Sequence, residues 1–299
     1  NINYAFTHPV TGKKLLLRVN CGSQMHLEHQ IEYEAHALRL MEGSGRTPKV
    51  LYVDGSKKIL EHGVLVMEYL PGHAMDYHTE LMLAAPCLAD IHSVQIPESE
   101  EVLIHPQNPL KAILEECEEM FKVYLESPLG DEEKKIYIRE LLDLGWKQEA
   151  ETRLESGYQC CINTELNSTN LLINGEGKSN YLIDWEKPLF GNPAQDLGHF
   201  LAPTTTFWKT DVILTSEEIE KFIDAYIKAV GNRFKTDMIR EHTHAFIPIT
   251  CLRGITWCAM AWVQYQQPDK LIFNESTFKK LNAYLDMDFL KNIRGYLEP

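Results

Sequence analysis

The sequence lacks the long apolar run that a membrane-spanning helix requires. Its most apolar stretch, residues 254–263, falls well short of the roughly 20 residues needed to cross a bilayer. We therefore expect no membrane insertion. The sequence also begins without a secretory signal. Because its first residue is Asn rather than Met, we expect the natural beginning of the chain to be missing.

Cysteine pairs at CxxC spacing are missing too, which argues against a structural zinc site. The 299 residues contain seven cysteines, and we expect these to be buried or idle thiols in a reducing cytoplasm. A Walker-type phosphate-binding loop is also absent. Gly12-Lys13-Lys14 has neither the upstream glycine nor the Ser or Thr of that motif, so it predicts a hairpin turn.

Basic residues are in deficit. Lys and Arg number 29 against 43 Asp and Glu, which gives a formal net charge of −14. This balance argues against nucleic-acid backbones and anionic membranes as partners. It fits small cationic ligands, or simply solubility. A hydrophobic fraction of 44% with 10% aromatic residues indicates a packed globular protein of one large domain or two ordinary ones.

The pattern along the chain predicts an α+β fold. A β-rich segment with one helix occupies residues 1–70, and the break Leu70-Pro71-Gly72 separates it from a mainly helical segment over residues 71–299. In the first segment, the apolar pattern predicts strands at residues 4–6, 15–19, 50–53 and 63–68 and a helix at 31–41. In the second, helices are expected at 81–92, within 110–156 and from 216 onward, with strands within 158–186.

The strand-rich part of the second segment predicts a hairpin with polar residues at its open end. Asn170 and Asp184 are equally distant from Gly177, near the centre of the turn, so an antiparallel pairing would place them opposite each other. Glu165 lies in the loop just before. Oxygen ligands gathered in this way suit Mg²⁺. The alternative is a surface hairpin with ordinary polar ends.

The same region resembles the aminoglycoside phosphotransferase and choline kinase family. The sequence runs NTELNSTN, then LIDWE, then GNPAQDLGHFL, in the order of that family's catalytic loop, metal-binding aspartate and following helix. The resemblance implies a bilobal protein-kinase-like fold: a small β-rich N-terminal lobe and a larger helical C-terminal lobe that carries the catalytic loop and the acceptor site. It also implies ATP as phosphoryl donor with Mg²⁺, and Asn170 and Asp184 as metal ligands.

The resemblance further implies a set of nucleotide-binding residues in the first lobe. Arg18, in LLLRV, occupies the place of the basic residue that contacts phosphates, and Glu34 that of its helical partner. Glu68, Tyr69 and Leu70 occupy the hinge that holds adenine. Independently, Glu34 falls on the apolar face of its predicted helix, where an unpaired charge would be costly. The alternatives are a Glu34 that reaches solvent and an Arg18 that protects a strand edge.

Two residues depart from the family's HxDxxxxN loop. Asn163 replaces the histidine and Glu165 replaces the aspartate, so Glu165 is the expected catalytic residue that orients the acceptor hydroxyl. The extra methylene of Glu could displace the carboxylate by about 1 Å, which can cost about a hundredfold in rate. Glu186 is a candidate for a second metal contact. Asp196 is expected either to brace the catalytic loop or to cap a helix.

The predicted function is an ATP- and Mg²⁺-dependent phosphotransferase that acts on a hydroxyl of a small molecule. The acidic balance suits choline, ethanolamine or an aminoglycoside, and a neutral sugar nearly as well. Residues 199–208 and 253–266 are candidate walls of the acceptor site, where Trp257, Trp262 and Tyr265 form either an aromatic box or part of a core helix. The alternatives are a nucleotide-binding pseudokinase and a kinase whose acceptor is a protein.

Overall fold

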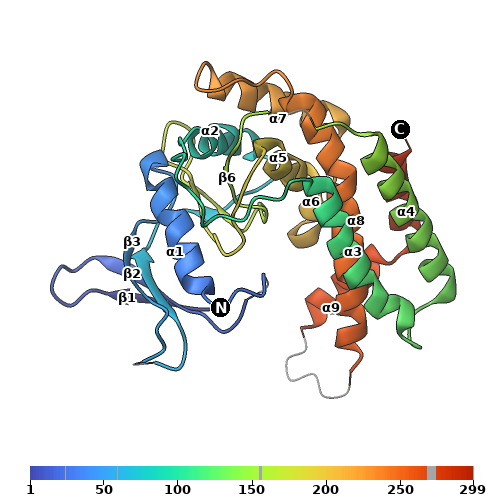
Figure 1. Cartoon of the computed structure of the whole chain (residues 1–299), viewed down its shortest axis with the longest axis horizontal. Helices are drawn as coiled ribbons and strands as arrows, with labels where there is room; N and C mark the ends of the chain where they lie inside the picture. The colour runs from blue at the N-terminus through green and yellow to red at the C-terminus, as the bar shows by residue number, and fades with distance from the viewer. Residues whose placement is uncertain (24, 59, 155–156, 268–273, 299) are drawn as a thin grey trace. The chain divides into compact units, whose positions relative to one another are not determined.

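The structure, a computed structural model, describes residues 1–23, 25–58, 60–154, 157–267 and 274–298. Its contacts divide the chain into two compact units (Figure 1). The first unit comprises Asn1–His105, Gly157–Asp196 and Ser216–Ile239, and the second comprises Pro106–Ser156, Leu197–Thr215 and Arg240–Pro299. These units are not the two segments that the sequence pattern delimits at residue 70, and that boundary stays a prediction.

The first unit opens with a four-stranded antiparallel sheet of order β1-β2-β4-β3. Each of these strands was predicted, to within two residues at either end. The predicted turn between β1 and β2 is also confirmed: the Gly12 N–H donates to His8 O at 2.9 Å, and Gly12 has a φ of +68°, which favours glycine. The strand bounds are β1 Ile2–Thr7, β2 Lys14–Val19, β3 Val50–Asp54 and β4 Val64–Glu68.

Helix α1 (Gln30–Met41) packs against this sheet, as Figure 1 shows, and is followed by the short 3₁₀ helix η1 (Glu42–Ser44). Its predicted apolar face is buried. Ile31, Ala35, Leu38 and Met41 are each at most 2% exposed, and Glu34 on the same face is 1% exposed. Burial of this stripe anchors the helix on the sheet. It also carries one carboxylate into the interior, so a partner for Glu34 is required.

Short strands and two helices complete the first unit. Strands β5, β7 and β8 form one antiparallel sheet, β6 pairs with β9, and helix α2 packs against helix α7. Helix α2 has the bounds that the sequence predicts, and helix α7 begins at the predicted residue. The element bounds are β5 His73–Ala74, α2 Leu81–His92, β6 Cys160–Ile162, β7 Leu171–Ile173, β8 Tyr181–Leu182, β9 Leu189–Gly191 and α7 Ser216–Val230.

The β7–β8 register corrects one expectation. Leu171 pairs with Leu182, and the Ile183 N–H donates to Asn170 O at 2.9 Å, so Asn170 lies opposite Ile183 and not opposite Asp184. Such a one-residue offset would turn the Asp184 side chain to the other face of a regular strand. Asp184 is instead left-handed, with a φ of +65°, and the strand ends before it. The chain therefore changes direction at the predicted metal ligand.

The second unit is helical. Two glycines allow close packing between its helices: a Cβ on Gly145 would lie 2.3 Å from Leu252 Cδ1, and one on Gly198 would lie 2.4 Å from Phe246 Cβ. Helix α5 begins in the first unit and ends in the second. The helix bounds are α3 Pro109–Glu126, α4 Glu132–Glu151, α5 Pro193–Leu201, α6 Pro203–Lys209, α8 Ile239–Tyr265, α9 Glu275–Tyr284 and α10 Met287–Leu297.

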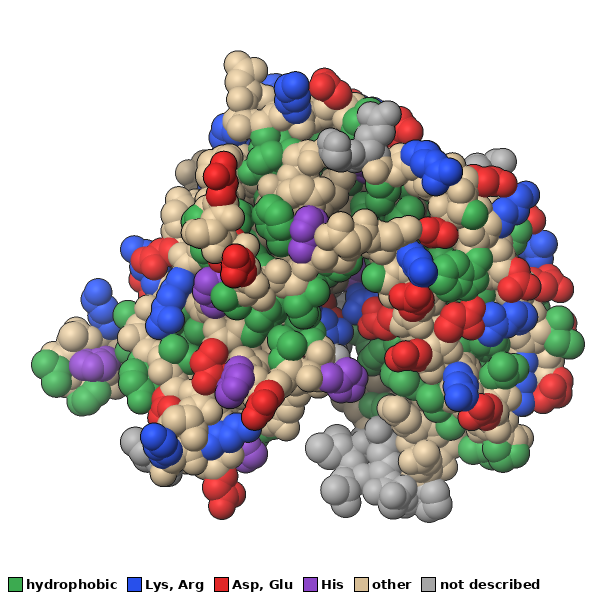
Figure 2. Space-filling view, viewed as in Figure 1, with side chains coloured by type: hydrophobic (Ala, Val, Ile, Leu, Met, Phe, Trp, Pro, Cys, Tyr) green, Lys and Arg blue, Asp and Glu red, His purple; other side chains and the backbone are tan. Residues whose placement is uncertain are grey.

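Helix α8 is the one helix among the described residues that is long and apolar enough to cross a membrane. However, 72% of its most apolar window is buried inside the protein, as in the core helix of a soluble protein, so this is weak evidence for a membrane span. All seven cysteines are free, and all but Cys21 are buried. In Figure 2, acidic and basic side chains are mixed over α3 and α4 in this view.

Candidate active site

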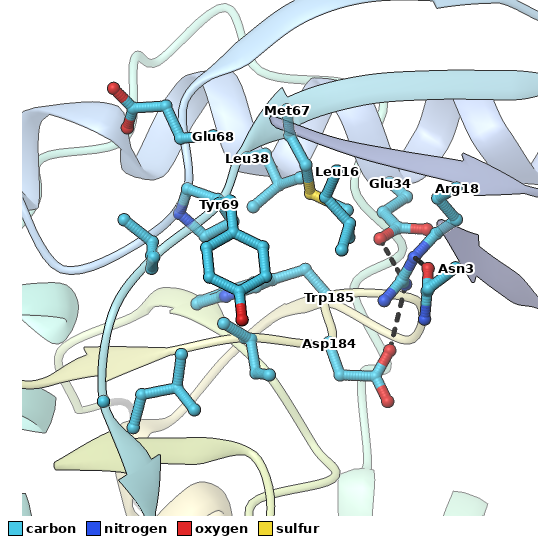
Figure 3. A pocket seen from close by; sticks show the side chains of 15 residues that line it. Asn3, Leu16, Arg18, Glu34, Leu38, Met67, Glu68, Tyr69, Asp184 and Trp185 are labelled. Carbon is cyan, nitrogen blue, oxygen red and sulfur yellow. Dashed lines mark hydrogen bonds and ion pairs between the residues drawn. The ribbon is translucent and has the colours of Figure 1, made fainter. Parts of the chain in front are cut away.

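A pocket of about 220 Å³ in the first unit is lined by all five predicted nucleotide-binding residues (Figure 3). Apolar side chains from several elements form its walls. Figure 3 shows Arg18, Glu34 and Asp184 together at one end, and residues 68–70 are also part of the lining. Such a pocket fits a ligand with a flat apolar part and an anionic part. The residues that line it include Asn3, Arg18, Glu34, Glu68, Tyr69, Leu70, Gly72, Leu172 and Asp184.

Arg18 connects three polar side chains at the charged end. Its Nη1 lies 2.6 Å from Glu34 Oε1 and 3.0 Å from Asp184 Oδ1, and its Nε donates to Asn3 Oδ1 at 3.1 Å (Figure 3). Arg18 is 5% exposed and Glu34 1%. The predicted Arg18–Glu34 pair is therefore present, and Asp184, predicted as a metal ligand, joins it. The contact with Asn3 was not anticipated, since one polar residue in a strand carries no signal of its partner.

Burial dominates the electrostatics of this group. Burial raises the pKa of Glu34 to about 7, which the nearby Arg18 guanidinium only partly offsets. Glu34 Oε2 is buried without a hydrogen-bond partner. Burial acts to lower the pKa of Arg18, but the charges of Glu34 and Asp184 outweigh it, so the pKa is raised and the guanidinium stays charged. The site therefore holds a fixed positive charge of the kind that binds phosphate.

The predicted hinge follows β4 and is fixed to its neighbours. The Glu68 N–H donates to Lys49 O at 3.0 Å, and Lys14 Nζ lies 3.8 Å from the centroid of the Tyr69 ring. At the end of the segment, Gly72 has a φ of +133°, and a Cβ there would lie 2.9 Å from Leu172 Cβ. Only glycine fits both this backbone conformation and this close approach. Residues 68–70 of the predicted hinge all line the pocket.

The predicted catalytic loop follows β6 and contains a left-handed residue. Thr164 has a φ of +66°, which is strained for a β-branched side chain. Its N–H donates to Asp196 Oδ1 at 2.7 Å, and the Asn163 N–H donates to Asp196 Oδ2 at 2.8 Å. Asp196 lies inside α5 and is completely buried. These bonds support the brace interpretation of Asp196 over the helix-cap alternative.

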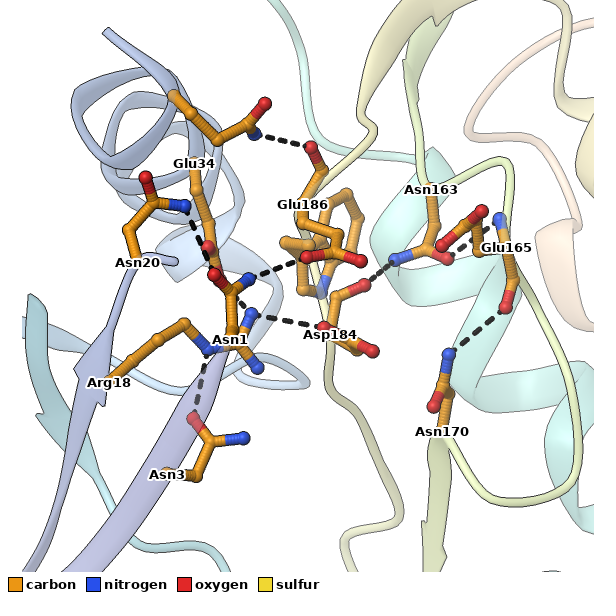
Figure 4. A network of polar contacts seen from close by, with 12 residues as sticks. Asn1, Asn3, Arg18, Asn20, Glu34, Asn163, Glu165, Asn170, Asp184 and Glu186 are labelled. Atoms are coloured by element: carbon orange, nitrogen blue, oxygen red, sulfur yellow. Dashed lines mark hydrogen bonds and ion pairs between the residues drawn. The ribbon is translucent and has the colours of Figure 1, made fainter. Parts of the chain in front are cut away.

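Asn163 makes the connections expected of a brace. Its Nδ2 donates to Asp184 O at 2.8 Å, and its Oδ1 accepts from the Glu165 N–H at 3.1 Å (Figure 4). Asn170 Nδ2 in turn donates to Glu165 O at 3.0 Å. Hydrogen bonds therefore link Asp184, Asn163, Glu165 and Asn170 in one network. In Figure 4 the Asp184 carboxylate and the Asn170 amide oxygen point toward the same space.

The Glu165 carboxylate has a partner, Lys187, that no motif in the sequence singles out. Lys187 Nζ lies 2.9 Å from Glu165 Oε1, with side chains 13% and 24% exposed respectively. Neighbouring Glu186 has a raised pKa, first because of burial and then because of the nearby Asp184 and Glu165 carboxylates. Its Oε2 accepts a hydrogen bond from Asn1 Nδ2. Four acidic side chains, including Glu34, thus gather around Arg18 and Lys187.

Both predicted acceptor walls, residues 199–208 and 253–266, belong to the second unit. Their aromatic residues have separate partners: Trp257 packs edge-to-face with Trp208 at 5.2 Å, Tyr265 stacks on Phe278, and Trp262 Nε1 donates to the side chain of Asn282. Trp257, Trp262 and Tyr265 therefore do not form a single box. The place of the acceptor stays a prediction. Within the described ranges, no group of three or more His, Cys, Asp or Glu side chains could hold a metal.

Comparisons with known proteins address the family and the fold. A search of curated proteins found no significant match to the sequence. Ethanolamine kinase from Plasmodium vivax superimposes with a TM-score of 0.67 at 15% identity, over 98% of this chain and 80% of that one. Spectinomycin phosphotransferase in complex with ADP and spectinomycin gives 0.62 at 14% identity, over 99% and 93%. Amicoumacin kinase in complex with AMP-PNP, Ca²⁺ and Ami gives 0.63 at 14% identity, over 98% and 85%.

These likenesses confirm the predicted α+β, protein-kinase-like fold. The model of the family described as "Phosphotransferase enzyme family" matches residues 1–241, which include every predicted catalytic, nucleotide-binding and metal-binding residue. The family and these neighbours support a small-molecule phosphotransferase. The suspected relationship to aminoglycoside phosphotransferases and choline kinases is thus confirmed. The chain belongs to the phosphotransferase enzyme family.

Proposed function

We propose that the protein transfers the terminal phosphoryl group of ATP to a hydroxyl group of a small molecule, with Mg²⁺ as the metal. The observation that best supports this is the lining of one pocket by a charged group, Arg18, Glu34 and Asp184, together with the hinge residues 68–70. A nucleotide has a flat base and anionic phosphates, which suit the apolar walls and the Arg18 guanidinium respectively.

The residues proposed to hold the metal fit Mg²⁺ chemically. Asp184 offers a carboxylate and Asn170 an amide oxygen, and Mg²⁺ prefers oxygen ligands with few from the protein. The Asp184 side chain is 34% exposed, which leaves access for phosphate oxygens and water. When bound, the ion would neutralise charge on the phosphates. Glu186, close in sequence to Asp184, is proposed as a further contact.

In this proposal each polar residue has one task. Arg18 binds phosphate oxygens while Glu34 restrains its guanidinium. Glu165 accepts the proton of the acceptor hydroxyl as the hydroxyl oxygen forms a bond to phosphorus and the bond from phosphorus to ADP breaks. Asn163 and Asp196 hold the loop that carries Glu165, through the bonds described above. Correct positioning, more than covalent chemistry, lowers the barrier of such a transfer.

The acceptor we propose is an amino alcohol, an aminoglycoside-like molecule or a sugar-like molecule. The structural neighbours include proteins named for ethanolamine and spectinomycin. A net charge of −14 favours a cationic acceptor by long-range attraction, although a neutral one would not be repelled. We place the activity in the cytoplasm, where ATP is available and where the seven free thiols would stay reduced.

A second candidate is a nucleotide-binding pseudokinase with little or no transfer. One observation favours it: the Glu165 carboxylate, already longer than the aspartate of the family loop, is paired with Lys187 at 2.9 Å. If that pair persisted in the complex, the carboxylate would be less available to the acceptor hydroxyl. The two candidates share nucleotide binding and differ in turnover.

The test is ADP release from Mg-ATP in the presence of ethanolamine, choline, spectinomycin and neutral sugars, each tested separately. We expect turnover with at least one acceptor, loss of turnover on removal of Mg²⁺ with EDTA, and loss in Asp184→Asn. Glu165→Gln should retain ATP binding by calorimetry but transfer far more slowly. Glu176→Gln, an exposed carboxylate in the β7–β8 turn, is the matched control. Tight ATP binding with no turnover for any acceptor would favour the pseudokinase.

A further inference from the structure

We propose that Lys187 is a positioning residue for phosphoryl transfer, which holds the Glu165 side chain where it can meet the acceptor hydroxyl. This inference rests on the proposed function. It assigns a role to a residue outside the catalytic loop and outside the predicted site.

The contact itself is well defined. Lys187 Nζ lies 2.9 Å from Glu165 Oε1, and the Lys187 side chain is only 13% exposed. A lysine this far from solvent is uncommon unless its charge is paired. The pair of Lys221 with Glu217 is as short, at 2.6 Å, but its side chains are 63% and 77% exposed. The Lys187 pair is therefore a partly buried contact of a different kind.

The backbone on which Lys187 sits is fixed on both sides. Lys187 O accepts a hydrogen bond from Thr164 Oγ1 at 2.7 Å, so the residue is attached to the catalytic loop through its main chain as well. The next carbonyl, Pro188 O, accepts from Tyr33 Oη at 2.6 Å, and the preceding one, Glu186 O, accepts from Gln30 Nε2 at 2.7 Å. Helix α1 and the catalytic loop thus anchor the segment from which the ammonium group extends.

The longer side chain at position 165 explains why such a contact is needed. Glu has one more rotatable bond than Asp, so its carboxylate loses more rotamer freedom when it is held in one place. It also lies near the Glu186 carboxylate, whose negative charge would repel it. An ammonium group on a fixed segment limits the rotamers of Glu165 and offsets this repulsion. Lys187 thereby compensates for the replacement of Asp by Glu in the loop.

The experiment compares Lys187→Met with Lys178→Met, using Mg-ATP and the most active acceptor of the panel above. Lys178 is an exposed lysine in the β7–β8 turn and serves as the matched control. We expect kcat of Lys187→Met to fall on the order of a hundredfold, with KM for ATP within about twofold. Lys187→Arg should recover part of kcat because it retains a charged donor. If Lys187→Met does not fold, as judged by circular dichroism, Lys187→Gln replaces it.

Coupling to Glu165 distinguishes positioning from direct phosphate binding. If Lys187 acts through Glu165, Lys187→Met should cost little further rate in the Glu165→Gln background. A full additional loss in that background overturns the assignment, as does an unchanged kcat in Lys187→Met alone. No turnover by the unsubstituted protein with any acceptor overturns the proposed function, and this inference with it. The two failures are therefore distinguishable.

Discussion

Replacement of Glu34 by Gln should remove a pH dependence from the stability of the protein. Glu34 is 1% exposed, one of its oxygens is buried without a partner, and its pKa is raised from 4.5 to about 7, chiefly by burial. In the unfolded chain the carboxyl group is hydrated and titrates at its ordinary value. Between these two pKa values the folded protein holds a proton that the unfolded chain releases.

The sign and size of the effect follow from that difference. A group with a raised pKa in the folded state contributes stability that is fully present below pH 4.5 and is lost as the pH rises through about 7. Each unit of pKa shift corresponds to about 1.4 kcal/mol, so the loss attributable to Glu34 is about 3 kcal/mol. Protonated Glu34 is close to Gln in shape. The two proteins should therefore be similar in stability at pH 4.5, and Glu34→Gln should be the more stable by about 3 kcal/mol at pH 8.

Urea unfolding at half-unit steps from pH 4.5 to 8 measures this difference. The control is Glu28→Gln, an exposed carboxylate just before α1, which should follow the unsubstituted protein at every pH. Parallel pH profiles for Glu34→Gln and the unsubstituted protein would refute the reasoning. They would mean that Arg18, at 2.6 Å, keeps Glu34 ionised despite its burial.

Three further substitutions test the framework of the site and of the second unit. Asp196→Asn should cost about 3 kcal/mol of stability, seen as a lower Tm, because two catalytic-loop N–H groups lose a buried charged acceptor. Gly72→Ala should cost about 1–3 kcal/mol and weaken ATP binding by calorimetry, since its Cβ would meet Leu172 at 2.9 Å in a strained backbone. Gly145→Ala should reduce stability by a similar amount through overpacking against Leu252, but it should leave ATP binding unchanged. If Gly145→Ala also weakened ATP binding, the weaker binding of Gly72→Ala could not be attributed to its place in the pocket.

The first unit was predictable where one local rule decides the outcome. The apolar stripe of α1 fixes which face is buried, and Glu34 stands out on it because an isolated carboxylate is costly there. A charged partner was therefore expected, and Arg18 is that partner. Strand β2 shows little polar–apolar alternation, but its Leu and Val residues predict a strand. Nothing in the sequence indicates that the Arg18 side chain of this strand donates to Asn3.

The β7–β8 hairpin shows where local rules end. Counting outward from Gly177 placed Asn170 opposite Asp184, but the loop conformation shifts the register by one residue. Gly175 and Gly177 both have positive φ, at +111° and +71°. The presence of two glycines shows that positive φ angles are permitted in this turn, but it does not determine the conformation of the whole turn. Register depends on the loop geometry, so a symmetric count can fail by one.

Local sequence rules are also insufficient to predict the effect of Glu165 on the loop. By sequence alone, Glu in place of Asp adds a methylene that could slow transfer but keeps a carboxylate that can accept a proton. In the fold, the lysine that follows Glu186 returns to the catalytic loop and contacts that longer side chain. Its backbone is held there by Thr164, whose left-handed conformation is itself held by Asp196. The effect of a substitution within a motif therefore depends on the residues that the new side chain contacts. For Glu165, we expect that effect on phosphoryl transfer to depend on Lys187.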